Sequence, residues 1–361
     1  MSGKTRSFQA PKGTRDFYPE ELLRRRYIAE SWRAVSIRHG FEEIDGPTFE
    51  HADLYTVKSG EGILSELFSF RREGGDDLYA LRPEFTPTLA RMYAARARQL
   101  PSPTRWFCIP NFFRAENPQR GRLREFFQWN VDVLGGEDTT GDAEVLNVIA
   151  DTLSTVGLQF NQALIKTSYR PALAQMFTGF GVGPEKHDAA FRLLDAASRL
   201  SPEVLQQRLM QLGFDKRSWP IFQDKIPVAI QVQNESTGQT EIHTLKALTP
   251  LMNACLFRSI NHWIKYDLSI VRGLAYYTGT VFEVIAEGER AIAGGGRYDN
   301  LVELFGGPPT PACGFGMGDV VLSLVLEDRG LMPKGMGELM DAVECVMRSY
   351  SMRPDAFVFS N

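Results

Sequence analysis

The sequence predicts an α+β fold whose sheet is mainly antiparallel. Strand-like segments come in pairs joined by turns or short loops, and such pairs occur both before and after a long helix-rich stretch. That stretch, about residues 170–260, is polar and has few glycine-rich turns, so we expect it to be an inserted helical subdomain. Hairpin-like pairs, rather than alternating strands and helices, favour antiparallel pairing in the surrounding sheet.

The composition excludes several classes of protein. The chain has 361 residues, 43% of them hydrophobic, and a formal net charge of −4, which suits a globular protein of one large domain or two to three smaller ones. No run approaches ~18 apolar residues, and the first residues contain no apolar segment, so we expect neither a membrane span nor a secretory signal. Because the whole chain is not basic, a nucleic-acid contact would need a local basic cluster.

The cysteines and histidines form no ligand-like pattern. The four cysteines lie far apart without a CxxC pair, and the five histidines show neither HxH nor HExxH spacing. We therefore expect no metal site built by the protein, no disulfide scaffold and a cytoplasmic location, where thiols stay reduced.

The N-terminal segments are expected to begin with a helix and a broken strand. Apolar side chains recur at helical spacing over residues 19–40, and Gly40 ends the pattern, so a helix is expected there. Residues 41–50 then read as a strand that breaks at Gly46-Pro47, as a strand at a sheet edge or boundary does.

A turn, a strand and a second helix follow. Residues 72–84 read as a turn at Gly74-Gly75 that leads into a strand. Thr86-Pro87 then opens a helix that runs to about Gln99. We expect Thr86 to be its N-cap and Pro87 to be its first helical residue.

The middle of the chain contains two strands joined by a basic loop. The strands are expected over residues 106–114 and 123–134, and residues 142–156 look helical. Four arginines lie around the loop: Arg114, Arg120, Arg122 and Arg124.

The C-terminal segments return to strands. Residues 314–333 read as a strand end that runs into a helix, and residues 353–361 begin like a strand. A lone terminal strand has no local partner. Either it docks on the preceding domain or, as we interpret it, it is the first strand of a further domain.

The segment from Arg122 onward alternates with a period of two, so its side chains point to opposite faces of a sheet. One face is apolar enough to be core and carries Leu123, Glu125, Phe127, Trp129, Val131 and Val133. The other face carries Arg122, Arg124, Phe126, Gln128, Asn130 and Asp132. This second face could simply be exposed to water. It also grades from cationic to anionic, which favours a pocket for a phosphate and a cation, or for one ligand with both charges.

Two other motifs carry candidate site residues. Glu84 precedes a helix, where a carboxylate is favoured by the helix dipole even without a ligand. Arg272 precedes a glycine, and Tyr276 and Tyr277 follow at a strand entry, where adjacent side chains should face opposite ways and one should be core.

The glycine-rich motifs give weaker signals. Residues 294–301 read as a glycine turn, and no GxxxxGK[ST] phosphate loop occurs. Gly314, Gly316 and Gly318 form GxGxG, which is a weak dinucleotide fingerprint without a clear preceding strand, so we expect them to allow close backbone approach.

Together these motifs resemble the class II histidyl-tRNA synthetases. The resemblance covers about residues 8–333 and includes RGLAYYTG and GGRYD, which are typical of this family and its paralogues. The motifs that carry it are PKGTRDFYP, LRPEFTPT, FFRAENPQRGRLREFFQWNVDVLG, VRGLAYYTGTVFE and GGGRYDNLVELFGGPPTPACGFGMG.

The resemblance implies a class II synthetase-like antiparallel sheet of six to seven strands flanked by helices, with a helical insertion, in a homodimer. The segment around Pro47 resembles the dimer-interface motif. The implied division is a catalytic core in two parts (1–169 and 261–333), the helical insertion (170–260), and a linker with the start of a truncated anticodon-binding domain (334–361).

The resemblance also implies roles in ATP binding. Arg114 matches the class arginine at the α-phosphate of ATP and the amino-acid carboxylate, and Arg272 matches the family's additional catalytic arginine at the α-phosphate. Glu116 matches the residue that meets the adenine amino group, and Arg122 matches a loop residue near the nucleotide. Mg²⁺ is expected to bind mainly through the ATP phosphates, with no metal site of the protein's own.

The implied histidine site has two ends. Glu84, Thr86 and Gln128 match contacts to the α-amino end, whereas Asp132 and Tyr277 match partners of the imidazole. Phe85 and Tyr276 are expected beside them. The implied activity is that of a histidine–tRNA ligase, with L-histidine, ATP and tRNA(His) as its partners.

The sequence departs from the family pattern at two positions. Ala275 replaces the usual aspartate, and Val321 stands where the third class motif has an arginine for the γ-phosphate of ATP. Either another cation, such as one from the Arg120–Arg124 loop, holds that phosphate, or ATP binding is weakened. The alternative function is a non-catalytic, histidine-sensing regulatory subunit of ATP phosphoribosyltransferase.

Overall fold

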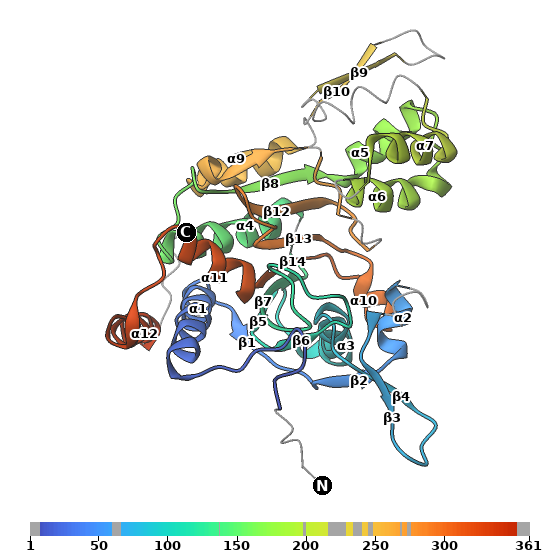
Figure 1. Cartoon of the computed structure of the whole chain (residues 1–361). Helices are drawn as coiled ribbons and strands as arrows, with labels where there is room; N and C mark the ends of the chain where they lie inside the picture. Colours follow the sequence, from blue (N-terminus) through green and yellow to red (C-terminus); the bar gives the residue numbers. More distant parts are fainter. Residues whose placement is uncertain are drawn as a thin grey trace.

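The computed structural model contains a nine-stranded mixed sheet flanked by helices, so the predicted α+β class is confirmed (Figure 1). The structure describes residues 8–59, 66–136, 138–197, 200–215, 229–233, 240–244, 248–267, 269–272 and 276–351. The strand-like tail at 353–361 and Ala275 lie outside the described residues.

The described sheet is antiparallel in its centre and parallel at its two ends. The strand order is β1 (Glu42–Glu43), β5 (Thr104–Cys108), β7 (Glu125–Leu134), β14 (Ala312–Gly318), β13 (Ala293–Arg297), β12 (Thr280–Ala286), β8 (Ala163–Tyr169) and β11 (Ile264–Tyr266). Strand β6 (Asn111–Phe113) also pairs with β7. Only the terminal pairs β1–β5 and β8–β11 are parallel, so the sheet extends beyond an all-antiparallel sheet of six to seven strands.

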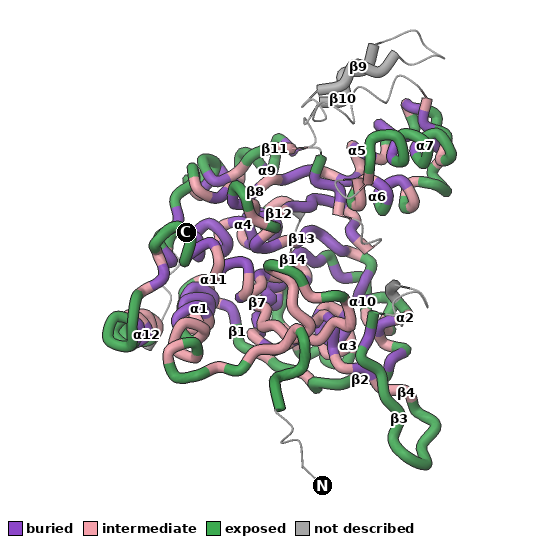
Figure 2. The backbone as a smooth tube through the Cα atoms, in the orientation of Figure 1, coloured by how far each residue is buried: buried purple, intermediate pink, exposed green. Residues whose placement is uncertain are grey.

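Helices cover one face of this sheet and form the main core with it. They are α1 (Pro19–Arg38), α4 (Asp138–Thr155), α9 (Thr249–Phe257), α11 (Asp319–Asp328) and α12 (Gly335–Ser351). Buried segments run through the sheet, α1 and α4 in Figure 2. The other face is partly covered by α3 (Thr86–Arg96), the 3₁₀ turn η2 (Ala97–Gln99) and α10 (Leu301–Leu304).

A small second sheet lies beside α3. It contains β2 (Phe49–His51), β4 (Leu78–Leu81) and β3 (Ser69–Arg71), with α2 (Asp53–Ser59) packed against it. The predicted break at Gly46-Pro47 therefore separates strands of two different sheets.

The apolar face of β7 is core, as its alternation predicts. Trp129, Val131 and Val133 are buried, whereas Phe127 at the start of the strand is only half-buried. The Trp129 ring stacks on Trp32 of α1, with centroids 5.9 Å apart, and its Nε1 donates a hydrogen bond to Ser36 Oγ at 3.0 Å. This contact fixes which face of β7 points away from the core.

The stretch at 170–260 contains a small helical cluster with its own apolar core. The cluster consists of α5 (Arg170–Gly179), the 3₁₀ turn η3 (Pro184–Lys186), α6 (His187–Asp195) and α7 (Pro202–Leu212). A hairpin of β9 (Ala229–Gln233) and β10 (Thr240–Thr244) follows. Helix α9 packs against α4 in the main core, and the 3₁₀ turn η7 (Asn261–Trp263) follows it.

Three local expectations are wrong. Thr86 is the first residue of α3, not its cap, because Phe85 occupies the N-cap position without a side-chain hydrogen bond. The glycines at 294–296 are not a turn but belong to strand β13. The strand expected over 106–114 is divided into β5 and β6.

None of the described helices combines the length and apolar character that a membrane span requires.

We predict that Gly295→Ala lowers the free energy of unfolding by roughly 1–3 kcal/mol, as overpacking does. A Cβ at this position would overlap the Gly314 carbonyl oxygen of the neighbouring strand and lie 2.7 Å from Phe315 Cβ. Urea unfolding measures the change. Gly337→Ala in α12 is the matched control, because a Cβ there has open space and should raise stability by up to ~1 kcal/mol. Equal stability of both variants would contradict this account of β13.

Candidate functional site

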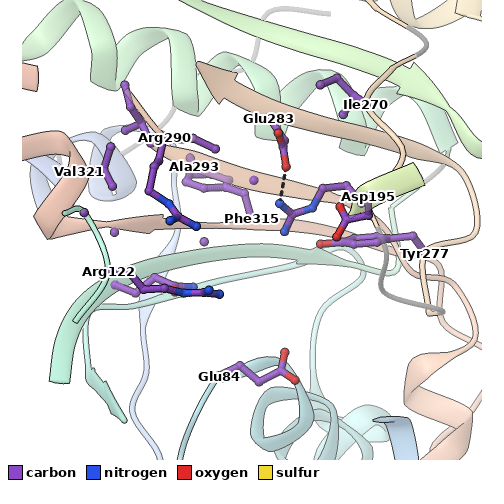
Figure 3. A pocket seen from close by; sticks show the side chains of 18 of the residues that line it. Glu84, Arg122, Asp195, Ile270, Tyr277, Glu283, Arg290, Ala293, Phe315 and Val321 are labelled. Carbon is purple, nitrogen blue, oxygen red and sulfur yellow. Dashed lines mark hydrogen bonds and ion pairs between the residues drawn. The ribbon is translucent and has the colours of Figure 1, made fainter. Parts of the chain in front are cut away.

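A cavity of about 940 Å³ lies on the side of β7, β14 and β13 that faces away from the main core (Figure 3). Helix α6 and the segment before Arg272 contribute to its wall. Most of the residues predicted for the site line it: Glu84, Thr86, Arg114, Arg122, Gln128, Asp132, Arg272, Tyr276 and Tyr277.

Two predicted site residues do not line the cavity. Phe85 is buried in the core around α3, where it occupies the N-cap position. Glu116 lies in the loop after β6 and forms an ion pair with Arg122, its Oε2 being 2.5 Å from Arg122 Nε.

Glycines on β13 and β14 leave space for the functional side chains. Gly294 pairs with Gly316, and Gly296 pairs with Gly314. A Cβ on Gly314 would overlap the side chain of Asp132, which lies across from it on β7, and a Cβ on Gly316 would overlap the side chain of Gln128 on the same strand.

The β13 glycines leave space for side chains on the opposite wall of the cavity. A Cβ on Gly294 would lie 2.5 Å from Arg272 Nη1, and one on Gly296 would lie 2.9 Å from the Tyr277 ring. The expected close approach is thus confirmed for Gly314 and Gly316, whereas Gly318 has open space around it.

One part of the cavity is built by polar groups of β7. Asp132 is buried and accepts a hydrogen bond from the Tyr298 hydroxyl, while Gln128 Nε2 donates to Asn130 Oδ1 at 2.9 Å. Burial raises the pKa of Asp132 to about 7, and the hydrogen bond from Tyr298 opposes that rise. This carboxyl group can therefore change charge near neutral pH.

The neighbouring part is cationic. Arg114 Nε donates to the Pro83 carbonyl oxygen at 3.1 Å, and its guanidinium lies 5.0 Å from the Phe126 ring centroid. Burial lowers the pKa of Arg114. The side chain is thus fixed on one wall, with its remaining nitrogens available for an anion.

Arg272 is fixed by its backbone and by an acid. Its φ is +46°, which is uncommon for a residue with a Cβ, and its Nη1 donates to Glu283 Oε1 at 2.8 Å. Burial acts to lower the pKa of Arg272, but Tyr277 and Glu283 outweigh it and the pKa is raised. The guanidinium therefore stays charged inside the protein.

The two tyrosines lie side by side, so the expectation that they face opposite ways is wrong. They precede β12 and are not part of a strand, so the period of two does not apply. Their ring centroids are 4.4 Å apart, their hydroxyl oxygens are 3.3 Å apart, and both residues line the cavity.

Several cavity residues were not found from the sequence. Glu283 gave a signal, since it is an acid inside the apolar run TVFEVI. Tyr298 is in the GGRYD motif, but only the fold brings it to Asp132. Asp195 of α6 and Arg290, which precedes β13, gave no local signal and are brought to the cavity by long-range packing (Figure 3).

Comparisons with known proteins agree with this arrangement. A family profile described as histidyl-tRNA synthetase matches residues 13–319. The histidine–tRNA ligase of Pyrococcus furiosus is 37% identical over 337 residues, which cover 90% of this chain and 76% of that protein.

Solved structures show the same fold. One, described as an ATP phosphoribosyltransferase regulatory subunit/histidyl-tRNA synthetase from Bacillus halodurans C, has a TM-score of 0.73 and 25% identity over 90% of this chain and 84% of that chain. The histidyl-tRNA synthetase from Nostoc sp. PCC 7120 also has a TM-score of 0.73, at 22% identity over 95% of this chain and 83% of that one. Because the profile matches residues 13–319 and the Pyrococcus furiosus relative is 37% identical, this chain belongs to the histidyl-tRNA synthetase family.

Proposed function

We propose that this protein is a histidine–tRNA ligase. It activates L-histidine with ATP to histidyl-adenylate and transfers the histidyl group to the 3′-terminal ribose of tRNA(His). The observation that carries the proposal is one cavity in which a buried carboxyl group, Asp132, faces the same space as Arg114 and Arg272. Family membership supports the same activity.

The first reaction needs no general base. The carboxylate of histidine is already ionised at pH 7 and attacks the α-phosphorus of ATP. A new P–O bond forms as the bond to pyrophosphate breaks. The barrier lies in bringing two anions together and in stabilising the charge of the in-line transition state. Arg114 and Arg272 supply fixed positive charge for both purposes.

The amino acid would be recognised by the acidic part of the cavity. Asp132 can accept a hydrogen bond from the imidazole, beside Tyr277, and Tyr298 holds its carboxyl group in place. Glu84 and Gln128 are suited to the α-ammonium group, because a carboxylate and an amide oxygen both accept from N–H. In Figure 3, Tyr277 lies at the right of the cavity and Glu84 at its lower side.

Mg²⁺ would accompany the ATP phosphates, since it prefers substrate phosphates together with one or two carboxylates. Glu283 is the cavity carboxylate beside Arg272 that could contact the ion. When bound, Mg²⁺ would neutralise part of the phosphate charge.

We further propose a homodimer. Phe49 and Phe70 on the small sheet are 49% and 43% exposed, and both pack against Tyr79 with centroids within 6 Å. An exposed aromatic cluster next to Pro47 suits a subunit contact.

We also propose a cytoplasmic location. Cys108, Cys255 and Cys313 are buried free thiols, and Cys345 is an exposed one. Free thiols suit a reducing compartment.

A non-catalytic, histidine-sensing regulatory subunit of ATP phosphoribosyltransferase is the second candidate. Two observations favour it. One of the similar solved structures has that description in its name, and Val321 stands where the family pattern has an arginine. The intact set of Arg114, Gln128 and Arg272 favours the ligase.

Histidine-dependent exchange of labelled pyrophosphate into ATP tests the proposal directly. We expect exchange in the presence of Mg²⁺ with histidine and not with a panel of other amino acids. Absence of exchange, together with histidine binding by calorimetry, would favour the regulatory subunit instead.

Arg272→Gln should lower the exchange rate by ~10²–10³-fold, the typical loss for one donor to transition-state charge. Arg208→Gln is the matched control, because Arg208 is exposed on α7 and does not line the cavity. Since Arg272→Gln also leaves Glu283 without its ion pair, urea unfolding of the variant separates a folding defect from a catalytic one. Wild-type exchange by Arg272→Gln would contradict the assigned role.

Asp132→Asn should change how stability depends on pH. The folded-state pKa of Asp132 is raised, so the folded protein binds more protons than the unfolded chain between about pH 4 and pH 7. The free energy of unfolding of the wild type should therefore fall by on the order of 2–3 kcal/mol, relative to Asp132→Asn, from pH 5 to pH 8. Urea unfolding at both pH values measures this, and parallel curves for the two proteins would contradict the buried, raised-pKa carboxyl group.

A further inference from the structure

The end of the cavity farthest from Tyr277 contains a second basic group. Gly121, Arg122, Arg290 and Val321 line this end. In Figure 3, Arg290 and Val321 lie together at the left of the cavity, Tyr277 lies at the right, and Glu84 lies below. The side chain of Arg290 points into the space between them.

The arginines that line the cavity differ in their partners. Arg122 is paired with Glu116 at 2.5 Å, and Arg272 is paired with Glu283 at 2.8 Å. Within the part of the chain that the structure describes, Arg290 has no ion-pair partner. Its charge is therefore available for an anion that enters the cavity.

The turn that carries Arg290 is fixed by two other arginines. It joins β12 to β13. Arg120 Nη2 donates to Glu289 Oε1 at 2.6 Å and to Asp328 Oδ2 at 3.0 Å. Arg329 Nη2 donates to the Glu287 carbonyl oxygen at 3.2 Å.

Arg120 belongs to the loop named above as a source of the replacing cation, and Arg329 directly follows α11, which carries Val321. Neither Arg120 nor Arg329 lines the cavity. Both stabilise the turn at 287–290 instead. Single exposed pairs contribute little to stability, but here two arginines bind one short turn, one of them also linking it to α11, and together they restrict its position.

Arg290 lies next to the position where the family pattern has a cation. A Cβ built on Gly121 would lie 3.3 Å from Arg290 Cδ and also 3.3 Å from Val321 Cγ2. The Arg290 side chain and the Val321 side chain therefore flank the same point. A guanidinium from the turn can occupy the space above Val321, which an arginine on α11 would otherwise use.

The direction of the reaction decides which part of ATP would reach this point. In an in-line displacement, pyrophosphate leaves on the side of the α-phosphorus opposite the attacking carboxylate. With histidine at the Tyr277 end, the terminal phosphates must extend toward the other end. We propose, on the basis of the function proposed above, that Arg290 binds the terminal phosphate of ATP in place of an arginine at position 321.

The test compares ligands with and without the terminal phosphates, using the full chain with Mg²⁺. Arg290→Gln removes the charge and keeps much of the side-chain volume. We expect KM for ATP and for pyrophosphate in the exchange reaction to rise by roughly 10- to 100-fold, the range for losing a charge-assisted hydrogen bond. Binding of a non-hydrolysable histidyl-adenylate analogue, which lacks those phosphates, should stay within about twofold of wild type.

Arg98→Gln is the control for the loss of one positive charge, because Arg98 is exposed and does not line the cavity. Its KM for ATP should equal that of the wild type. Retained binding of the adenylate analogue by Arg290→Gln shows that the variant is folded.

The outcomes separate this inference from the proposed function. An unchanged KM for ATP in Arg290→Gln, with a wild type that exchanges pyrophosphate, would overturn the role of Arg290 alone. An equal loss of affinity for ATP and for the adenylate analogue would also overturn it, because the effect would not depend on the terminal phosphates. A wild type without exchange would contradict the proposed function itself.

Discussion

Four glycines, two on each of two adjacent central strands, leave the space that the cavity occupies, and the rest of the site depends on this constraint. Gly294 and Gly296 on β13 face Gly316 and Gly314 on β14. Any Cβ at these positions would overlap groups that the site uses or lie too close to them, namely Arg272, Tyr277, Gln128 and Asp132. The opposite face of the same strands is filled, with Phe315 packed edge-on against Trp129 at 4.9 Å. A sheet with one packed face and one bare face can bury functional groups without losing its core.

Two groups in the cavity are held in states that cost free energy. Burial raises the pKa of Asp132, and Arg272 has a backbone conformation that residues with a Cβ rarely adopt. Each of these states costs free energy that the surrounding structure must offset. Perturbed groups that meet in one cavity are typical of sites that bind or transform charged ligands.

The sequence predicted the fold class and much of the cavity for different reasons. Alternation along β7 identified both the core residue Trp129 and the cavity residues Gln128 and Asp132, because a strand needs only its own period to separate two faces. Motif resemblance identified Arg272 and the tyrosines. By contrast, Arg290 and Asp195 reach the cavity through contacts between segments that are distant in sequence, and no local pattern encodes such contacts. The orientation of Tyr276 was mistaken because the period of a strand was applied to residues outside a strand.

The stacked pair of Trp32 and Trp129 has a practical consequence. Trp129 lies between Gln128 and Asn130 in the chain, and both of these neighbours line the cavity while the indole itself is buried on the other face. Its emission depends on the hydrogen bond to Ser36 and on the stack with Trp32, both of which follow the position of β7. Once the tryptophans outside this pair are replaced, the indole would therefore be an optical reporter of the strand, on the opposite face of the sheet from the cavity.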